Sequence, residues 1–164
     1  MKNLSPAEIL ELLPQKGPMR FVDEILEIDD HHALGVYTWK EADCAGHFPG
    51  NPVVPGVKLV EMASQIGNIA WGFYHKARKT DAENLKDLMG FFITVEGGIF
   101  KKMVTPGEKV AALATMRSGD SFSFENPSAL VEIHFHGGVK DGESIFQGVV
   151  SSAWFSKDSL SAKV

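Results

Sequence analysis

The sequence has a single cysteine, no excess of positive charge and no apolar core of the signal-peptide kind at its N-terminus. With only Cys44 in 164 residues, no internal disulfide framework can form, so we expect a reducing compartment, the cytoplasm. The net charge of -5 argues against a nucleic-acid partner, which usually requires a basic surface. No repeat, low-complexity segment or linker divides the chain, and we expect one domain over residues 1–164.

The longest apolar stretch covers residues 57–74. Lys58, Glu61 and Asn68 interrupt it, and a bilayer core would disfavour all three, so we expect no membrane span. Its apolar residues fall on nearly every side of a helix, which places such a helix in a protein interior. We therefore predict a long central helix over about residues 57–76.

Residues 46–56 precede that helix and cannot themselves be helix or central strand. Three prolines and three glycines occur within these eleven residues, and proline lacks the amide donor that both structures use. The segment predicts a rigid loop, and its one ionisable side chain is His47.

The rest of the chain predicts a sheet around the central helix. The segments rich in strand-forming residues are 20–28, 33–40, 88–95, 109–117, 129–139 and 144–155. Strand fragments around Phe122 and Phe124 are expected in a loop, and Asp141-Gly142 is typical of a two-residue hairpin turn. About six strands, most of them antiparallel, together with one buried helix give an α+β fold.

Three further segments have local signatures. Ser5, Pro6 and Glu8 are typical of a helix N-terminus, and we expect a short helix over residues 5–13. Residues 75–86 are rich in charge and predict a surface excursion, with continuation of the central helix by a turn or two as the alternative. The polar tail, residues 157–164, is expected to be frayed.

His47 and Glu61, fourteen residues apart, are the first candidates for chemistry. A histidine can act as a base near neutral pH, and a carboxyl group on an apolar helix has an opposed environment, which favours an acid/base pair. The alternative is structural, since loop histidines often only hydrogen-bond and the helix dipole alone favours a glutamate near a helix start.

The start of the central helix, at Gly56 and Val57, is a second candidate. Unpaired amides and partial positive charge at a helix N-terminus can bind a carbonyl oxygen that gains negative charge. A glycine would let that carbonyl approach the backbone closely, although Gly56 could equally do no more than permit the turn.

The order of residues from Gly46 to Val57, followed by Glu61 and Gln65, resembles the signature of the (3R)-3-hydroxyacyl-acyl carrier protein dehydratases of fatty-acid synthesis. The resemblance implies the hotdog fold, in which a curled antiparallel sheet wraps one long helix. It extends more loosely to Leu13-Pro14, Phe21–Asp23, Phe100–Lys102 and Pro106–Glu108.

The resemblance also implies roles for single residues. His47 would be the catalytic histidine and Glu61 the catalytic acid, and a glutamate there resembles the branch that only dehydrates. The amide of Gly56 or Val57 would hold the thioester oxygen, with Gln65 as a supporting partner of Glu61. In such enzymes the histidine and the acid come from different subunits of a homodimer, and a trimer of dimers is a further option.

Two surfaces follow from the same resemblance. Ile66, Ile69 and Phe73 would line an acyl tunnel, although each could be core only. Lys101 and Lys102 would dock an acyl carrier protein, although a solvated basic face has the same composition.

The chain departs from the family pattern in three places. Gln15–Pro18 replaces His-Arg-Tyr-Pro, Glu41–Ala45 replaces Asn-Glu-Pro-Phe-Phe, and residues 75–87 differ where a mobile gating loop would fall. These segments shape substrate access, so the departures concern chain length and carrier recognition more than the reaction.

Other interpretations compete with dehydration. Cys44 could be a nucleophile, but a lone cysteine is more often a packing residue. His134 and His136 share a strand face, yet no third ligand of suitable spacing stands out, so we expect neither a metal nor a cofactor. The hotdog fold also carries acyl thioesterases and could carry a non-catalytic acyl-thioester-binding protein.

Overall fold

The computed structural model describes residues 3–116 and 127–161. Its elements are α1 (Pro6–Leu12), β1 (Glu24–Ile28), β2 (His32–Thr38), the 3₁₀ helix η1 (Glu41–Cys44), α2 (Gly56–Ser64), the π-helix η2 (Gln65–Ala70), α3 (Trp71–Lys76), α4 (Ala82–Lys86), β3 (Leu88–Phe100), β4 (Lys109–Thr115), β5 (Ser128–Phe135), β6 (Ser144–Ser156) and α5 (Lys157–Ser161). The strand fragments expected around Phe122 and Phe124 lie outside the described residues.

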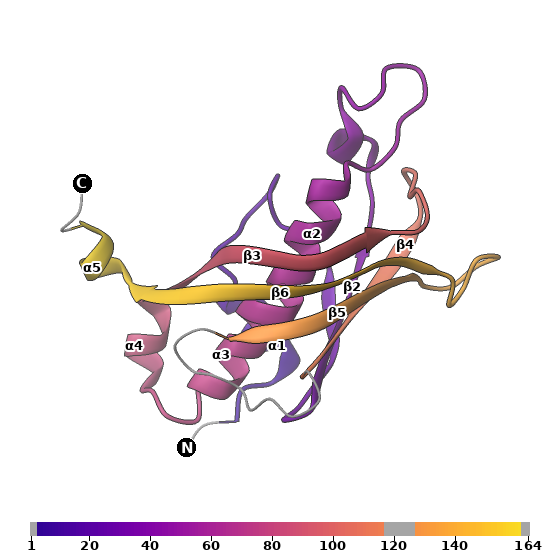
Figure 1. Cartoon of the computed structure of the whole chain (residues 1–164). Coiled ribbons are helices and arrows are strands. Elements are labelled where there is room, and N and C mark those ends of the chain that lie inside the picture. Colours follow the sequence, from indigo (N-terminus) through magenta and orange to yellow (C-terminus); the bar gives the residue numbers. More distant parts are fainter. Residues whose placement is uncertain (1–2, 117–126, 162–164) are drawn as a thin grey trace.

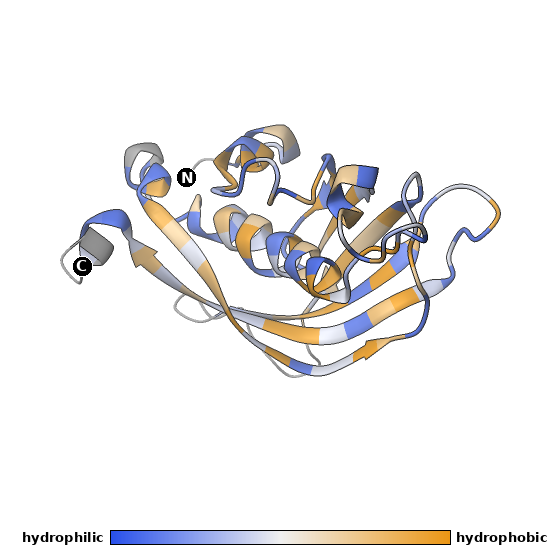
Figure 2. Cartoon of the chain, turned by 90° about the horizontal axis from the view of Figure 1, so that it is seen from above, coloured by the Kyte–Doolittle hydropathy of each residue, from blue (hydrophilic) through white to orange (hydrophobic). Residues whose placement is uncertain are grey.

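The six strands form one antiparallel sheet in the order β1-β2-β4-β5-β6-β3, so β1 and β3 are its edges. The sheet curls around the central helix (Figure 1), and in Figure 2 it forms a curved trough beneath that helix. Buried and half-buried residues alternate along β5, which is the pattern of a strand with one face on the core. The expected α+β architecture is confirmed.

The central helix is continuous from Gly56 to Lys76, but its middle turn is a π-helix. The helix packs closely against the sheet because glycines replace side chains at the contacts. A Cβ atom on Gly35 would lie 2.1 Å from Ile66 Cδ1, and one on Gly67 would lie 2.7 Å from Val131 Cγ2. π-Helical turns inside α-helices occur frequently at functional sites.

The N-terminal helix agrees with its sequence pattern, whereas the C-terminal segment is more regular than its polar composition predicts. Ser5 caps α1, because its hydroxyl accepts from the amide of Glu8 at 3.3 Å and the Glu8 carboxylate accepts from the amide of Ser5 at 2.9 Å. At the other end, Lys157–Ser161 form helix α5 where a frayed tail is expected. The hydroxyl of Ser159 donates to the carbonyl of Ser156 at 2.7 Å, which stabilises that turn locally.

Residues 75–86 are not a simple surface excursion. The central helix continues through Lys76, so that His75 and Ala77 are buried, and α4 buries Leu85. The segment therefore packs against the rest of the domain through His75, Ala77 and Leu85, although most of its residues are charged or polar. In the described part of the chain, no helix is both long enough and apolar enough to cross a membrane.

Strand β3 is longer than the sequence predicts. It runs through a register shift between Glu96 and Ile99, at Gly97-Gly98, and continues to Phe100. Every residue from 91 to 100 is exposed. β3 is thus a long edge strand of the sheet, exposed on both faces from residue 91 to residue 100. The backbone groups along its outer side pair with no other strand among the described residues.

Candidate active site

His47 lies in the loop between η1 and α2, which projects beyond the sheet near the start of α2 (Figure 1). The amide of Val53 donates to the carbonyl of His47 at 3.0 Å, which closes the loop on itself. Nδ1 of His47 lies 2.9 Å from the carbonyl oxygen of Val53. Because a carbonyl only accepts, Nδ1 carries the proton, and Nε2 of the neutral ring keeps a lone pair for a proton from outside.

Glu61 lies in the second turn of α2 and is half-buried. Its Oε1 accepts from Nε2 of Gln65 at 2.9 Å and from Nε2 of Gln15 at 3.4 Å. Within the described residues, Oε2 has no hydrogen-bond partner. The carboxyl group is therefore oriented through one oxygen, and the other is available to a ligand.

Gln65 is the residue that fixes this carboxyl group. Its side chain is completely buried, and Oε1 accepts from the amide of Phe21 at 2.8 Å. Nε2 donates to the carbonyl of Met19 at 2.7 Å as well as to Glu61. Since a primary amide nitrogen has two hydrogens, both donors are used, and Gln65 connects the chain before β1 to Glu61.

Gln15 is a site residue that sequence reasoning missed. It lies in the segment that replaces His-Arg-Tyr-Pro, which we linked to substrate access and not to the acid. The signal was that very departure, because an amide now stands where the resembling proteins have a histidine. The structure places this amide against the Glu61 carboxylate.

The start of α2 has free amides. The amide of Lys58 donates to the carbonyl of Pro55 at 2.9 Å, whereas no acceptor for the amides of Gly56 and Val57 lies within the described residues. The side chain of Val57 is 76% exposed, so this helix start opens outward.

At Gly56 a close contact, and not the backbone angles, favours glycine. It is absent from the glycines with positive φ, and a Cβ atom there would lie 3.1 Å from carbons of the Phe100 ring. Phe100 is itself half-exposed and stacks on Phe146 with 5.0 Å between ring centroids. The helix start and the end of β3 thus meet at this glycine.

The structure does not join the two candidate catalytic groups. Within the described part of one chain, no hydrogen bond or ion pair links His47 to Glu61. One chain brings together Glu61, Gln65 and Gln15, and it presents His47 separately on the projecting loop.

The candidate tunnel and docking residues lie in different surroundings. Ile66, Ile69 and Phe73 are buried between helix and sheet, and Phe73 packs edge-on against Trp154 at 4.9 Å between ring centroids. Lys101 and Lys102 are exposed. Nζ of Lys101 donates to Oε1 of Gln147 at 3.2 Å, and Lys102 is paired with Glu143 at 2.9 Å.

Cys44 is a packing residue at the end of η1. Burial raises the pKa of its thiol, and the neighbouring carboxylate of Asp43 raises that pKa further, so a reactive thiolate is disfavoured. Asp43 is also buried and accepts from the hydroxyl of Tyr37 and the amide of Lys40, each at 2.9 Å. The segment that replaces Asn-Glu-Pro-Phe-Phe is therefore firmly anchored.

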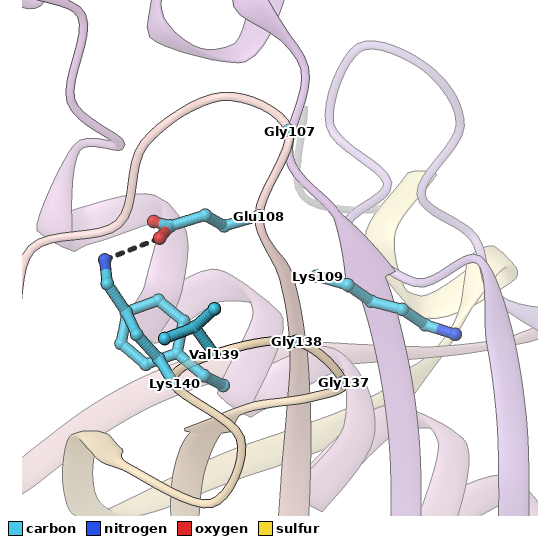
Figure 3. A pocket seen from close by; sticks show the side chains of 8 residues that line it. Gly107, Glu108, Lys109, Gly137, Gly138, Val139 and Lys140 are labelled. Carbon is cyan, nitrogen blue, oxygen red and sulfur yellow. Dashed lines mark hydrogen bonds and ion pairs between the residues drawn. The ribbon is translucent and has the colours of Figure 1, made fainter.

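Neither His47 nor Glu61 lines either of two surface pockets. One, of about 240 Å³, has an ion pair between Glu108 and Lys140 beside it at 2.6 Å (Figure 3). It is lined by Gly107, Glu108, Lys109, Phe135, Gly137, Gly138, Val139 and Lys140. The other, of about 490 Å³, lies beside the loop that carries Gln15 and is lined by Glu11, Leu12, Leu13, Pro14, Lys16, Lys86, Met89 and Lys157.

Two solved structures share the fold of this chain. A dehydratase heterocomplex, ApeI:P from Xenorhabdus doucetiae, superposes with a TM-score of 0.73 over 97% of both chains at 17% identity. A thioesterase from Haemophilus influenzae superposes with a TM-score of 0.65 over 95% of this chain and 94% of the other at 13% identity. The hotdog fold is thereby confirmed.

Sequence relatives agree with the motif. A 3-hydroxyacyl-[acyl-carrier-protein] dehydratase FabZ from Rhizobium rhizogenes is 40% identical over 107 residues, which are 63% of this chain and 62% of the relative. The FabZ of Allorhizobium ampelinum is 41% identical over 116 residues, 66% of this chain and 70% of the relative. The match thus spans less than two thirds of the length of the Rhizobium rhizogenes protein.

The family model of the ApeI-like dehydratases, described as ApeI dehydratase, matches residues 37–138. This match covers more than half of the chain and includes the loop, the helix start, Glu61 and Gln65. The resemblance seen in the motif is confirmed, and the chain belongs to the ApeI-like dehydratase family.

Proposed function

We propose that the protein dehydrates a (3R)-3-hydroxyacyl thioester to the trans-2-enoyl thioester. The observation that carries the proposal is the state of Glu61, a carboxyl group anchored through one oxygen by Gln65 and Gln15 and free at the other. It lies on the helix whose first two amides, those of Gly56 and Val57, have no acceptor among the described residues. Family membership and the FabZ relatives support the same reaction.

The proposed mechanism uses three groups. Nε2 of His47 removes a proton from C2, and the amide of Gly56 or Val57 stabilises the negative charge that develops on the thioester oxygen. Glu61, directly or through a water molecule, protonates the C3 hydroxyl as it leaves. The C2–H and C3–O bonds break, the C2–C3 double bond forms, and water is released. A glutamate as the acid supports dehydration without isomerisation.

A homodimer would complete this site. The exposed edge β3 supports it, since long unpaired edge strands readily pair with another chain. Seven large apolar side chains on or just after that strand are exposed: Phe91, Phe92, Ile93, Val95, Ile99, Phe100 and Met103. The Xenorhabdus doucetiae structure that shares this fold is a heterocomplex, so a different chain is the alternative partner. A trimer of such dimers is the further step.

The substrate would arrive on an acyl carrier protein. The names of the FabZ relatives and the exposed Lys101 and Lys102 support this partner, since carrier proteins are acidic. Fatty-acid or related lipid synthesis in the cytoplasm is the matching setting, and the single buried thiol, Cys44, fits a reducing compartment. Ile66, Ile69 and Phe73 would line the acyl tunnel.

Purified protein should interconvert a 3-hydroxyacyl thioester and its 2-enoyl product, followed by the absorbance of the enoyl thioester. His47→Ala and Glu61→Gln should each lower kcat by about 10²- to 10⁴-fold, the usual contribution of a general acid or base. His31→Gln, in the exposed turn between β1 and β2, is the matched control and should keep full activity.

Other outcomes point elsewhere. Release of a free thiol without enoyl product would indicate a thioesterase. Bound acyl ligand without any product would indicate a binding protein. Full activity of either variant would exclude the assigned roles.

A further inference from the structure

Asn68, in the middle of η2, is an unusual residue for a helix buried under a sheet. It is completely buried, and within the described residues neither its Oδ1 nor its Nδ2 has a hydrogen-bond partner. A buried amide without hydrogen-bond partners is energetically unfavourable, because it has lost its hydrogen bonds to water. The residues around it show what this amide faces.

Successive residues of η2 step across the sheet. Ile66 contacts Gly35 of β2, Gly67 lies against Ala114 of β4 and Val131 of β5, and Ile69 lies against Gly90 of β3. Strand β6 lies between β5 and β3 in the sheet. Asn68, between Gly67 and Ile69 in this sequence of contacts, therefore faces β6.

The level along β6 follows from two contacts. Near the helix start, Gly56 touches Phe100, which stacks on Phe146 of β6; near the helix end, a Cβ on Gly72 would lie 2.3 Å from Trp154 of β6. β6 thus runs in the same direction as the helix.

Asn68 precedes Gly72 by four residues, about 6 Å of helix. The same distance along a strand corresponds to about two residues, or about 7 Å, and the residue two positions before Trp154 is Ser152. Asn68 is therefore level with Ser152.

Ser152 has the same unusual property as Asn68. It is completely buried, and its Oγ has no hydrogen-bond partner among the described residues. Nε1 of Trp154, on the same face of β6, is also buried and without a partner there. Two donors, one acceptor and one hydroxyl on the facing sides of the central helix and β6 thus have no partner among the described residues, and an alkyl chain could satisfy none of them.

We propose that Asn68, Ser152 and Trp154 form a polar subsite that binds a hydroxyl or carbonyl group on the distal part of the acyl chain. The inference rests on the proposed function. Asn68 is seven residues beyond Glu61 on the same helix, about 10 Å along its axis, so this group would be far from the reacting carbons. The substrate class is then an oxygen-bearing acyl thioester, and unsubstituted fatty acyl chains are poorer substrates.

The test uses pairs of 3-hydroxyacyl pantetheine thioesters of equal length, one ending in a methyl group and the other in a hydroxyl group, over a series of lengths. At the length that reaches Asn68, the hydroxyl member should have a kcat/KM at least about tenfold higher, since one buried hydrogen-bond group is worth about 1.4 kcal/mol or more.

Asn68→Leu, a replacement of similar volume, should reduce that ratio to one or below, and Ser152→Ala should reduce it in part. Ser151→Ala, whose side chain points to the opposite face of β6, is the matched control and should leave the ratio unchanged. Binding of the same pairs to the Glu61→Gln variant, measured by calorimetry, should show the same preference without turnover.

Equal kcat/KM and equal binding for both members at every length would overturn the subsite. That result with normal turnover of the methyl series would leave the proposed function intact. Failure of the proposed function has a different signature, which is no interconversion of any pair, and the binding measurement still decides the subsite in that case.

Discussion

At the scale of single residues, the candidate site depends on how one carboxyl group is held. Glu61 shares its Oε1 with two amide side chains, one from its own helix and one from a loop 46 positions earlier in the chain. Gln65 in turn is fixed by backbone groups on both sides of Arg20. The orientation of the acid is thus set by the packing of the N-terminal segment against the central helix.

The first prediction concerns Gln65→Glu. A carboxyl group at this position still accepts from the amide of Phe21, but it has at most one proton to donate, so it cannot keep both the bond to the carbonyl of Met19 and the bond to Glu61. Loss of a hydrogen bond to a charged group costs about 1.5–3 kcal/mol, so kcat should fall about 10- to 100-fold. Two carboxyl groups in contact hold a proton more tightly than one, so the alkaline limb of the pH profile of kcat should move to higher pH.

The control for this variant is Gln147→Glu, on the surface of β6. With a pantetheine thioester as substrate it should change neither kcat nor the pH profile. A Gln65→Glu enzyme that is less stable but has an unmoved alkaline limb would show that Gln65 acts only on the fold.

The motif predicts that His47 lies on a loop and that Gly56, Glu61 and Gln65 lie on the helix after it, because loop and helix are contiguous in sequence. It does not predict Gln15, because contact between residues 15 and 61 depends on how the N-terminal segment folds back on the helix. It also leaves open why Gly56 is glycine, since Phe100 is distant in sequence.

At the scale of elements, the type of each main element follows from the sequence, and the exceptions have identifiable causes. The π-turn over Gln65–Ala70 is invisible to hydrophobic periodicity because the helix is apolar on nearly all sides. Asp141-Gly142 predicts a two-residue hairpin turn, whereas the loop spans residues 136–143. There the carboxylate of Asp141 accepts from the amide of Gly137 at 2.8 Å, which supports a wider loop.

The last turn of helix α3 contains a buried histidine, His75. The charge of residues 75–86 instead predicts that His75 lies at the surface. His75 is 9% exposed and contacts the rings of Trp71 and Tyr74. Burial lowers its pKa to about 4, with Asp30 opposing the shift and Arg78 and Lys79 adding to it. The folded protein therefore keeps this imidazole neutral in mildly acidic solution.

The second prediction is a loss of stability on acidification. The unfolded chain binds a proton at His75 below about pH 6.5, and the folded protein does so only near pH 4. Stability is therefore complete above pH 6.5 and falls as the pH decreases toward 4. Between pH 7 and pH 5 this group should lower the free energy of unfolding by about 2 kcal/mol, measured by urea denaturation.

His75→Gln should remove that part of the pH dependence, whatever it does to stability at pH 7. His31→Gln, at an exposed histidine, should leave the dependence as in the parent protein. The same slope in the parent and in His75→Gln would mean that His75 is not the group responsible.

At the scale of the whole molecule, the proposed homodimer would account for two features of the single chain. The sheet of the chain ends in an exposed apolar edge at β3, and within the described residues no hydrogen bond or ion pair joins the proposed base, His47, to the proposed acid, Glu61. The contact between Gly56 and Phe100 places the helix start at the end of that same edge. A second copy paired along β3 would cover the apolar strand beside the helix start, where the thioester carbonyl is proposed to bind.

The last prediction tests whether such a site is shared. If His47 and Glu61 of one site come from different subunits, a dimer of one His47→Ala chain and one Glu61→Gln chain has one doubly defective site and one intact site. Random coexpression gives half mixed dimers, so the activity should recover to about a quarter of the parent value, as the twofold symmetry requires. Each variant alone should stay at least about 100-fold below the parent.

Coexpression of His47→Ala with the double variant His47→Ala/Glu61→Gln is the control, because no pairing of these chains restores a site. If the first mixture is no more active than this control, His47 and Glu61 must act within one chain. In that case the projecting loop would have to fold back onto α2 for catalysis. Recovery near a quarter instead means that the loop serves the partner, and association of two chains becomes a requirement for activity.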